Sequence, residues 1–233
     1  MAELEGSTVL VVGANGAFGV EFCKQLMSAG VKVIGTATNA ETSVSLRSDL
    51  HQRLLLDLES SESINTLASF LANSAEPLDG IILASGLVAF GPITDTPQSV
   101  GAKLHQVNAL GPIQLTSQLV AKLRNSVDLG GSPFIVSISG VIAESPMPGL
   151  AAYSSSKTAM HGFAVAAAKE LKKLGIRWLD ARPGHTESGL AARAIFGTAP
   201  NFGVGMSVES VVGRIIAGIT ADEKDLPSTS FQK

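Results

Sequence analysis

Residues 8–19 read TVLVVGANGAFG and join a short apolar run to a glycine-rich turn. The run Thr8–Val12 is typical of a strand buried in a parallel sheet. Gly13, Gly16 and Gly19 permit a tight turn and let a ligand approach the backbone closely. A helix that follows such a turn offers free N–H groups and a positive dipole end, which suit the pyrophosphate of a dinucleotide. The G-x-x-G-x-x-G spacing differs from the general G-x-G-x-x-G motif, so on its own it fits a plain strand–helix turn equally well.

The rest of the chain alternates strand-like and helix-like segments, which favours the dinucleotide interpretation. Further strands are expected at Val31–Thr36, Arg53–Asp57, Leu78–Ala84, Pro133–Ser139 and Ile176–Ala181. Helices are expected from the glycine turn to Ala29 and at Glu41–Leu50, Ser60–Asn73 (capped by Ser60 or Ser61), His105–Arg124, Tyr153–Leu174 and Val208–Ile219.

This alternation implies right-handed crossovers and therefore an α/β fold. We expect a doubly wound parallel sheet of Rossmann type, with helices on both faces, in a single NAD(P)-binding domain that spans residues 1–233. Residues 187–205 are expected to form a short lid over the substrate, and the polar tail 221–233 to hold a short edge strand. Ligands of such sheets bind at the carboxyl ends of the strands, so the loops that follow the strands carry the candidate site.

The composition excludes several classes of protein. Hydrophobic residues make up 45% and charged residues 16% of the 233 residues, which excludes disorder, and the net charge of -3 argues against a nucleic-acid partner. The single cysteine, Cys23, excludes a disulfide framework and fits a core position in a cytoplasmic protein. There is no signal-peptide pattern and no long apolar run, so no membrane partner is expected, and no metal-ligand spacing occurs.

The choice of cofactor in this fold depends on the end of the second strand. An acid there favours NAD, but residues 35–39 read GTATN and the first acid is Glu41. Hydroxyl groups such as those of Thr36 and Thr38 can hold a 2′-phosphate, so NADP(H) is expected in preference to NAD(H). Asp57, at the end of the third strand, either accepts a hydrogen bond from the adenine amino group or caps the turn that follows.

A tyrosine and a lysine lie four residues apart where a helix is expected to begin. Tyr153 and Lys157 would share one helix face, and Tyr153 is the only tyrosine of the chain. The phenol has an ordinary pKa near ~10, which a neighbouring ammonium lowers because it favours the phenolate. Tyr153 could then exchange a proton with a substrate oxygen while a nicotinamide exchanges the hydride.

The sequence resembles the short-chain dehydrogenase/reductase family along nearly its whole length. The matching motifs, in the family's order and spacing, are GANGAFG at 13–19, LLLD at 54–57, LASG at 83–86, VNALG at 107–111, IVSISG at 135–140, YSSSK at 153–157 and RPG at 182–184. The segment KVIGTAT at 32–38 is similar to the ketoacyl reductase branch, which uses NADPH. The resemblance implies an NAD(P)-dependent enzyme that exchanges a hydride with a carbonyl or a secondary alcohol.

The resemblance also implies a role for each matched residue. Tyr153 would be the acid/base, Lys157 would hold the nicotinamide ribose and lower the tyrosine pKa, and Asn108 would hold a proton-relay water. Besides these three, the cofactor contacts would be Gly13, Asn15, Gly16, Ala17, Phe18, Gly19, Thr36, Thr38, Asp57, Leu58, Ala84, Ser85, Gly86, Pro183, Gly184, Thr186 and Ser188.

The sequence departs from the family at the catalytic serine. The position thirteen residues before Tyr153, where the family has serine, holds Gly140. Ser139 lies one residue earlier and points to the other side of the strand unless a bulge at Gly140 re-aims it. Ser139 is therefore either the substrate-polarising residue or a buried serine bonded to the backbone. His161 is expected to pack or to contact a second subunit, and His185 to be structural.

The leading hypothesis is an NAD(P)-dependent carbonyl reductase. Apolar side chains in the loop Val141–Leu150 and in the lid, such as Ile142 and Phe202, predict a fairly apolar small-molecule substrate. An epimerase of the extended type is disfavoured because little chain remains for a substrate domain, whereas a cofactor-binding sensor or assembly partner without catalysis stays as the alternative. By resemblance, the helices His105–Arg124 and Tyr153–Leu174 form the dimer face of a homodimer or homotetramer. The run of small residues at 164–168 faces either this partner or its own sheet.

Overall fold

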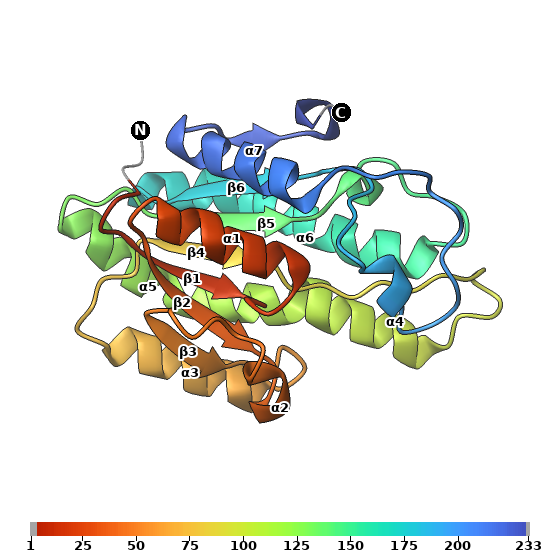
Figure 1. Ribbon diagram of the computed structural model, residues 1–233, viewed down its shortest axis with the longest axis horizontal. Helices are drawn as coiled ribbons and strands as arrows, with labels where there is room; N and C mark the ends of the chain where they lie inside the picture. Colours follow the sequence, from red (N-terminus) through yellow and green to blue (C-terminus); the bar gives the residue numbers. More distant parts are fainter. Residues whose placement is uncertain (1–3, 232–233) are drawn as a thin grey trace.

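The computed structural model describes residues 4–231 and confirms the doubly wound, Rossmann-type α/β domain (Figure 1). Its strands are β1 (Thr8–Val12), β2 (Lys32–Ala37), β3 (Gln52–Leu55), β4 (Gly80–Leu83), β5 (Phe134–Ile138), β6 (Arg177–Ala181) and β7 (Asp225–Leu226). They form one parallel sheet in the order β3-β2-β1-β4-β5-β6-β7. The direction of winding reverses between β1 and β4, which opens a ligand crevice at the carboxyl ends of these strands.

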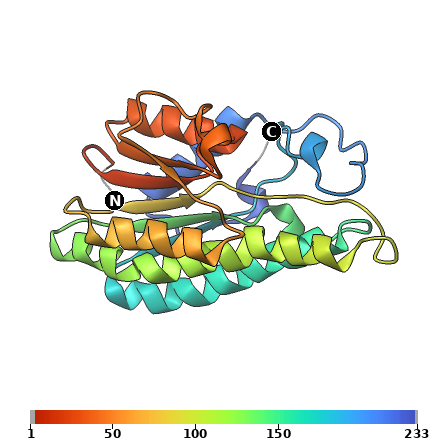
Figure 2. The same cartoon turned by 90° about the horizontal axis from the view of Figure 1, so that it is seen from below.

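Helices cover both faces of the sheet. On one face lie α1 (Ala17–Ser28) and α7 (Val208–Thr220), and on the other α3 (Ser61–Asn73), α5 (Gly111–Asp128) and α6 (Ala151–Leu171) run side by side (Figure 2). Each face buries its own apolar cluster, because parallel strands point side chains to both sides. Cys23 lies on α1 in one of these clusters, as expected, and is fully buried.

The helix expected at Glu41–Leu50 is wrong in length: only one turn forms, α2 (Ala40–Ser43). Asn39 and Thr42 close a capping box at its start. The hydroxyl groups of Ser43 and Ser45 then donate to the carbonyls of Ala40 and Thr42, a local bonding pattern that competes with helix propagation. By contrast Ser60 caps α3 as expected, by accepting a hydrogen bond from the Ser63 N–H.

The long helix expected at His105–Arg124 begins earlier and is interrupted. It starts as α4 (Gln98–His105), passes through a π-helical turn η1 (Gln106–Leu110) and continues as α5. Pro112 has no N–H for the carbonyl four residues before it, so it breaks the α-helical ladder at this point. A side chain at Gly111 would meet the Leu58 carbonyl oxygen at 2.6 Å, so the interrupted helix lies close against the loop after β3.

The C-terminal part forms the expected irregular segment and edge strand. Residues 186–205 carry one 3₁₀ turn, η4 (Ala191–Arg193), and β7 completes the sheet beside β6. This segment, which was expected to be a lid, is tied to the loop after β4, since the Ile195 N–H donates to the Val88 carbonyl and the Phe90 N–H donates to the Phe196 carbonyl. Within residues 4–231 no helix combines the length and apolar character that a membrane span needs.

Candidate active site

A cavity of about 770 Å³ runs along the carboxyl ends of the central strands. Its walls come from the glycine turn after β1, the loops after β2 to β6, the first turns of α6 and the lid. Sequence-predicted residues that line it are Gly13, Asn15, Gly16, Ala17, Phe18, Thr38, Asp57, Leu58, Ala84, Ser85, Gly86, Ser139, Tyr153, Lys157, Pro183, Gly184, Thr186 and Ser188. The predicted cofactor-binding and acid/base residues thus meet in one space.

The glycine turn fits the phosphates of a dinucleotide. Gly13 has φ +79°, and a Cβ there would lie 2.3 Å from Ser85 Oγ, so the turn accepts only glycine at this position. A Cβ on Gly16 would meet a single atom within 4 Å, the Gly13 carbonyl oxygen at 3.4 Å, so its other side is open to the cavity. The N-terminus of α1 follows directly at Ala17 and supplies the N–H groups and dipole that favour an anion.

Two residues assigned to the cofactor have other functions in the structure. Thr36 is 1% exposed and lies outside the cavity wall; its hydroxyl accepts a hydrogen bond of 3.1 Å from the Gly13 N–H and so fixes the turn. Gly19 also lies outside the wall. A Cβ on Gly19 would stand 2.0 Å from the Gly13 carbonyl oxygen, so this glycine lets α1 close against the turn. Both residues shape the glycine turn from the side that faces away from the cavity.

One part of the cavity, in which an adenosine was expected, lies beyond the ends of β2 and β3. Asp57 lines it, and its Oδ1 accepts a hydrogen bond of 2.8 Å from the Glu59 N–H, as the capping alternative requires. Of the two threonines at the end of β2, Thr38 reaches the cavity wall and Thr36 does not. Lys103 on α4 also lines the wall and pairs with Glu59 at 2.7 Å. This pair was missed from the sequence because it joins segments 44 residues apart.

Tyr153 and Lys157 lie on the first turns of α6 and face the cavity. Burial raises the pKa of Tyr153 to about 12 and lowers the pKa of Lys157 to about 8, while the charge of Asp180 opposes this lowering. The Lys157 Nζ is 6.0 Å from the centre of the tyrosine ring and donates to the Ile138 carbonyl at 2.8 Å. The expected lowering of the tyrosine pKa by this ammonium is therefore not found, because burial dominates at the phenol.

Asn108 lies behind the cavity wall, in the π-helical turn η1. Its Oδ1 accepts from the Leu87 N–H at 2.8 Å, and its Nδ2 donates to the Leu87 carbonyl at 2.9 Å and to Ser156 Oγ at 3.0 Å. A Cβ on Gly86 would lie 3.4 Å from Lys157 Nζ and 3.5 Å from Asn108 Oδ1, so the amide and the ammonium flank the same glycine. The asparagine thereby fixes the loop after β4 beside the lysine.

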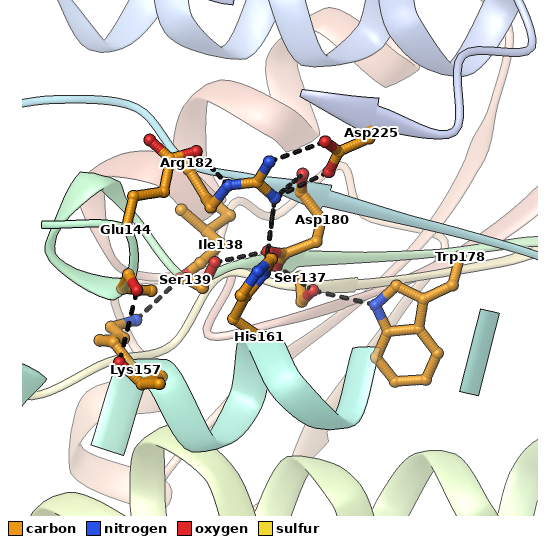
Figure 3. A network of polar contacts seen from close by, with 12 residues as sticks. Ser137, Ile138, Ser139, Glu144, Lys157, His161, Trp178, Asp180, Arg182 and Asp225 are labelled. Carbon is orange, nitrogen blue, oxygen red and sulfur yellow. Dashed lines mark hydrogen bonds and ion pairs between the residues drawn. The ribbon is translucent and has the colours of Figure 1, made fainter. Parts of the chain in front are cut away.

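The structure does not give Ser139 the free hydroxyl that a substrate-polarising residue needs. Ser139 is 0% exposed, and its hydroxyl donates to the Asp180 carboxylate at 2.6 Å (Figure 3). A hydroxyl has one proton, so a group that donates to a buried carboxylate cannot donate to a carbonyl as well. Gly140 has φ 75° and ψ 162°, a conformation that is essentially restricted to glycine. The backbone itself thus disfavours a serine at position 140.

The loop after β6 forms a further part of the cavity wall. Pro183 and Gly184 follow the strand, and the Thr186 hydroxyl donates to the Gly184 carbonyl at 3.0 Å. His185 lines the cavity, with its ring centre 5.1 Å from that of Phe202 and its Nε2 3.6 Å from Glu187.

Several residues of the wall were not among the predicted site residues. They include Thr42, Leu56, Glu59, Lys103, Val107, Leu190 and Arg193. Leu56 and Val107 lie in the motifs LLLD and VNALG, and Leu190 and Arg193 lie in the segment expected as a lid. Thr42, Glu59 and Lys103 lie in none of these and reach the wall through the tertiary fold. Among residues 4–231, no group of three His, Cys, Asp or Glu side chains could hold a metal ion.

Comparison with known proteins relates this geometry to a family. A family model described as short chain dehydrogenase matches residues 7–195. A short chain dehydrogenase of Pseudocercospora fijiensis is 28% identical over 198 residues, which cover 82% of this chain and 63% of that protein. Dehydrogenase/reductase SDR family member 7B of Xenopus tropicalis is 25% identical over 244 residues, which cover 97% and 78%. The chain thus spans less than two thirds of the first of these relatives.

Solved structures share the fold at lower identity. The 3-ketoacyl-(acyl-carrier-protein) reductase of Brucella melitensis, complexed with NADH, has a TM-score of 0.85 at 18% identity and covers 97% of this chain and 99% of its own. A short chain dehydrogenase from Burkholderia cenocepacia in complex with NADP has a TM-score of 0.83 at 18% identity, covering 97% and 89%. Because the family match at residues 7–195 takes in both the glycine turn and the Tyr153–Lys157 pair, the chain belongs to the short-chain dehydrogenase/reductase family.

Proposed function

We propose that this protein is an NADP(H)-dependent carbonyl reductase that acts on a fairly apolar small molecule. The observation that carries the proposal is the shared cavity: Tyr153 and Lys157 line the same space as Gly13 and Gly16. A dinucleotide on the glycine turn would extend along this space toward the tyrosine. When bound, the nicotinamide supplies the hydride that reduces the carbonyl carbon.

Tyr153 donates the proton in the proposed reaction. Its phenol stays protonated at neutral pH, because burial holds its pKa at about 12, so it can give a proton to the oxygen of the reduced carbonyl. Lys157 holds the nicotinamide ribose and favours the phenolate that the transfer leaves behind. Asn108, which fixes the loop beside Lys157, holds the water that returns a proton to the pair.

The proposed substrate is apolar because of the walls around Tyr153. The buried residues Val88, Phe90, Ile142 and Leu150 form one apolar cluster, against which Tyr153 packs together with lid residues. Burial of a substrate side chain against these residues contributes about 25 cal/mol for each Å² removed from water. A highly charged sugar gains little from such a wall.

Preference for NADP(H) is supported by the end of β2. The chain has no acid between Gly35 and Asn39, and Thr38 lines the cavity there. The solved relatives include complexes with NADP and with NADH, so the fold serves either cofactor. A thermal-shift titration with NADPH and with NADH compares the two directly, and a larger shift with NADH would contradict the preference.

Self-association is proposed through the exposed sides of α5 and α6. Leu110, just before α5, is 56% exposed and Val165 on α6 is 43% exposed. Ala164 and Ala167 are buried against the chain's own sheet, so only part of the small-residue run at 164–168 is free for a partner. Sedimentation equilibrium tests this proposal, because a monomer at micromolar concentration would contradict it.

The isosteric variant Tyr153→Phe tests the reaction. We expect turnover of a ketone panel to fall by two orders of magnitude or more, since general acid catalysis contributes 10²–10⁴-fold, while the NADPH-induced rise in Tm persists. The matched control is Ser155→Ala, which changes an exposed residue of the same helix outside the main cavity. Undiminished turnover in Tyr153→Phe would contradict the assigned role.

The alternative is a cofactor-binding protein without catalysis. The hydroxyl of Ser139 is bonded to Asp180 and Gly140 has no side chain, and both facts favour this alternative. NADPH binding by the wild-type protein, with no turnover on any ketone, aldehyde or alcohol of the panel, would support it instead of the reductase.

A further inference from the structure

A network of buried polar side chains lies beside Lys157, at the ends of β5 and β6 (Figure 3). Its centre is Asp180, whose side chain is 5% exposed. A buried carboxylate costs several kcal/mol of desolvation and is kept only where donors surround it. The surroundings of Asp180 therefore indicate what the carboxylate does.

Four donors meet at the Asp180 carboxylate. Ser137 Oγ donates to Oδ1 at 2.5 Å, and Ser139 Oγ donates to Oδ2 at 2.6 Å. His161 Nδ1 lies 2.8 Å and Arg182 Nη1 lies 3.1 Å from the same Oδ2. Ser137 lies in β5 and Ser139 comes directly after the strand, so Asp180 binds both residues that flank Ile138.

Arg182 anchors the carboxylate from the other side. Its guanidinium forms a bidentate pair with Asp225 on β7, with both distances 2.7 Å, and its Nε bonds to Glu144. The hydrogen bond with Asp225 is the main cause that raises the pKa of Arg182 above its ordinary value. One cation thus joins the ends of three segments of the chain and holds Asp180 in one place.

The network touches the site through the backbone of β5. The Ile138 carbonyl, between the two fixed serines, accepts the hydrogen bond of 2.8 Å from Lys157 Nζ. The next residues are held as well, since Gly140 N–H donates to Ala181 and Val141 N–H donates to Pro183. The position of the Ile138 oxygen, and hence of the ammonium, depends on how Asp180 fixes Ser139.

We propose that Asp180 is a positioning residue of the reductase: through Ser139 it holds the end of β5 so that Ile138 aims Lys157, and its buried negative charge keeps Lys157 an ammonium. This inference rests on the proposed function, because it assigns a residue to that same site. It also explains the sequence anomaly, since Ser139 takes part in catalysis as a link to Lys157 and not as a donor to the substrate.

The electrostatics of the lysine agree with this assignment. Burial lowers the pKa of Lys157 to about 8, and the charge of Asp180 acts in the opposite direction. Tyr153 on the same helix is a further titratable group beside Lys157, at 6.0 Å from ring centre to Nζ, and His161 and Arg182 contact the Asp180 carboxylate itself. Gly86 and Asn108, which flank the ammonium from the loop after β4 and from η1, carry no charge. Asp180 is thus an anion whose charge supports the ammonium against the effect of burial.

The test uses two variants that separate the charge from the hydrogen bond. Asp180→Asn removes the negative charge at nearly constant side-chain shape. Ser139→Ala removes the hydrogen bond from Ser139 to Asp180 and keeps the charge. We expect kcat to fall roughly 10- to 100-fold in both variants with little change in KM, because small misplacements of a catalytic group cost this much. Only Asp180→Asn should move the alkaline limb of the kcat profile to lower pH, since loss of a nearby anion lowers a lysine pKa.

The matched control is Ser126→Ala. Ser126 is also a buried serine that donates to an aspartate, Asp79, at 2.5 Å, but at the opposite end of the sheet. Its variant should lose stability without any change in the pH profile. A direct readout, the titration of Lys157 by NMR of 13Cε-labelled lysine, measures the ammonium without turnover.

The outcomes are distinguishable. A wild-type protein without turnover would contradict the proposed function. The NMR titration of Lys157 in the wild type and in Asp180→Asn would still report whether Asp180 supports the ammonium. An active wild type, with unchanged alkaline limb and Lys157 titration in Asp180→Asn, would overturn the electrostatic part. Equal kcat in Ser139→Ala and Ser126→Ala would overturn the positioning part, and this comparison stands even where Asp180→Asn does not fold.

Discussion

Gly16 and Gly19 should respond differently to the same added methyl group. Gly16 lines the cavity, whereas Gly19 is buried where α1 meets the turn. The variants Gly16→Ala and Gly19→Ala therefore separate the contact with a cofactor from the packing that shapes the glycine turn. Gly162→Ala is the control, because Gly162 is an exposed position of α6 with no atom within 4 Å of the added Cβ.

The structure sets the size of each effect. At Gly16 the backbone has φ -80° and ψ 165°, which alanine adopts without strain, so stability should change by less than about 1 kcal/mol. At Gly19 the new Cβ would lie 2.0 Å from the Gly13 carbonyl oxygen and 2.6 Å from Ala14 Cα. Both are backbone atoms, so the turn must shift, at a cost of about 1–3 kcal/mol. This corresponds to a fall in Tm of roughly 2–12 °C.

Thermal unfolding with and without NADPH measures both effects. At about a hundred times its Kd a ligand adds ~2.7 kcal/mol, or roughly 5–10 °C in a domain of this size. Gly16→Ala should keep the Tm of the free protein and need at least about tenfold more NADPH for the same shift, a loss of about 1.4 kcal/mol. An unchanged NADPH titration in Gly16→Ala, or a wild-type Tm in Gly19→Ala, would refute the assignment of the turn.

Three further predictions concern residues around the site. Thr36→Val keeps the side-chain shape but leaves the Gly13 N–H without its hydrogen-bond acceptor. The free energy of unfolding, measured by chemical denaturation, should therefore fall by about 1–3 kcal/mol. NADPH binding should weaken as well, although Thr36 lies outside the cavity wall. Gly140→Ser should restore no activity and should cost about 1–3 kcal/mol, because φ 75° with ψ 162° strains any other residue; a stable, faster enzyme would contradict this. Lys157→Met tests how the lysine pKa affects stability. The pKa of Lys157 is about 8 in the folded protein and 10.5 ordinarily, so the unfolded chain binds more protons than the folded one between these values. The free energy of unfolding of the wild type, relative to that of the variant, should therefore rise from pH 8 to pH 10.

Much of the fold could be predicted because the signals were local. The strands lie within two residues of their expected positions, since buried parallel strands are continuous apolar runs between turn residues. The single turn at α2 was not predictable from periodicity, because Leu46 and Leu50 are buried as in a helix while the serine hydroxyls end it. The π-helical turn before Pro112 likewise depends on how the chain continues on both sides of the proline.

Site residues could be predicted only where the residue type has a single structural or chemical role at its position in the fold. Gly13 and Gly16 of the strand–helix turn and the Tyr153–Lys157 pair at helical spacing meet this condition, and these four residues line one cavity. A hydroxyl has several uses, so Thr36 and Ser139 could each be assigned to a ligand, yet one accepts from Gly13 and the other donates to Asp180.

The partner decides what a hydroxyl does, and the partners of Thr36 and Ser139 come from other segments of the chain. The role of Asp180 could not be predicted either, for the same reason. A lone acid in an apolar strand has no motif, and its part in the site follows only from the two serines that β5 presents to it.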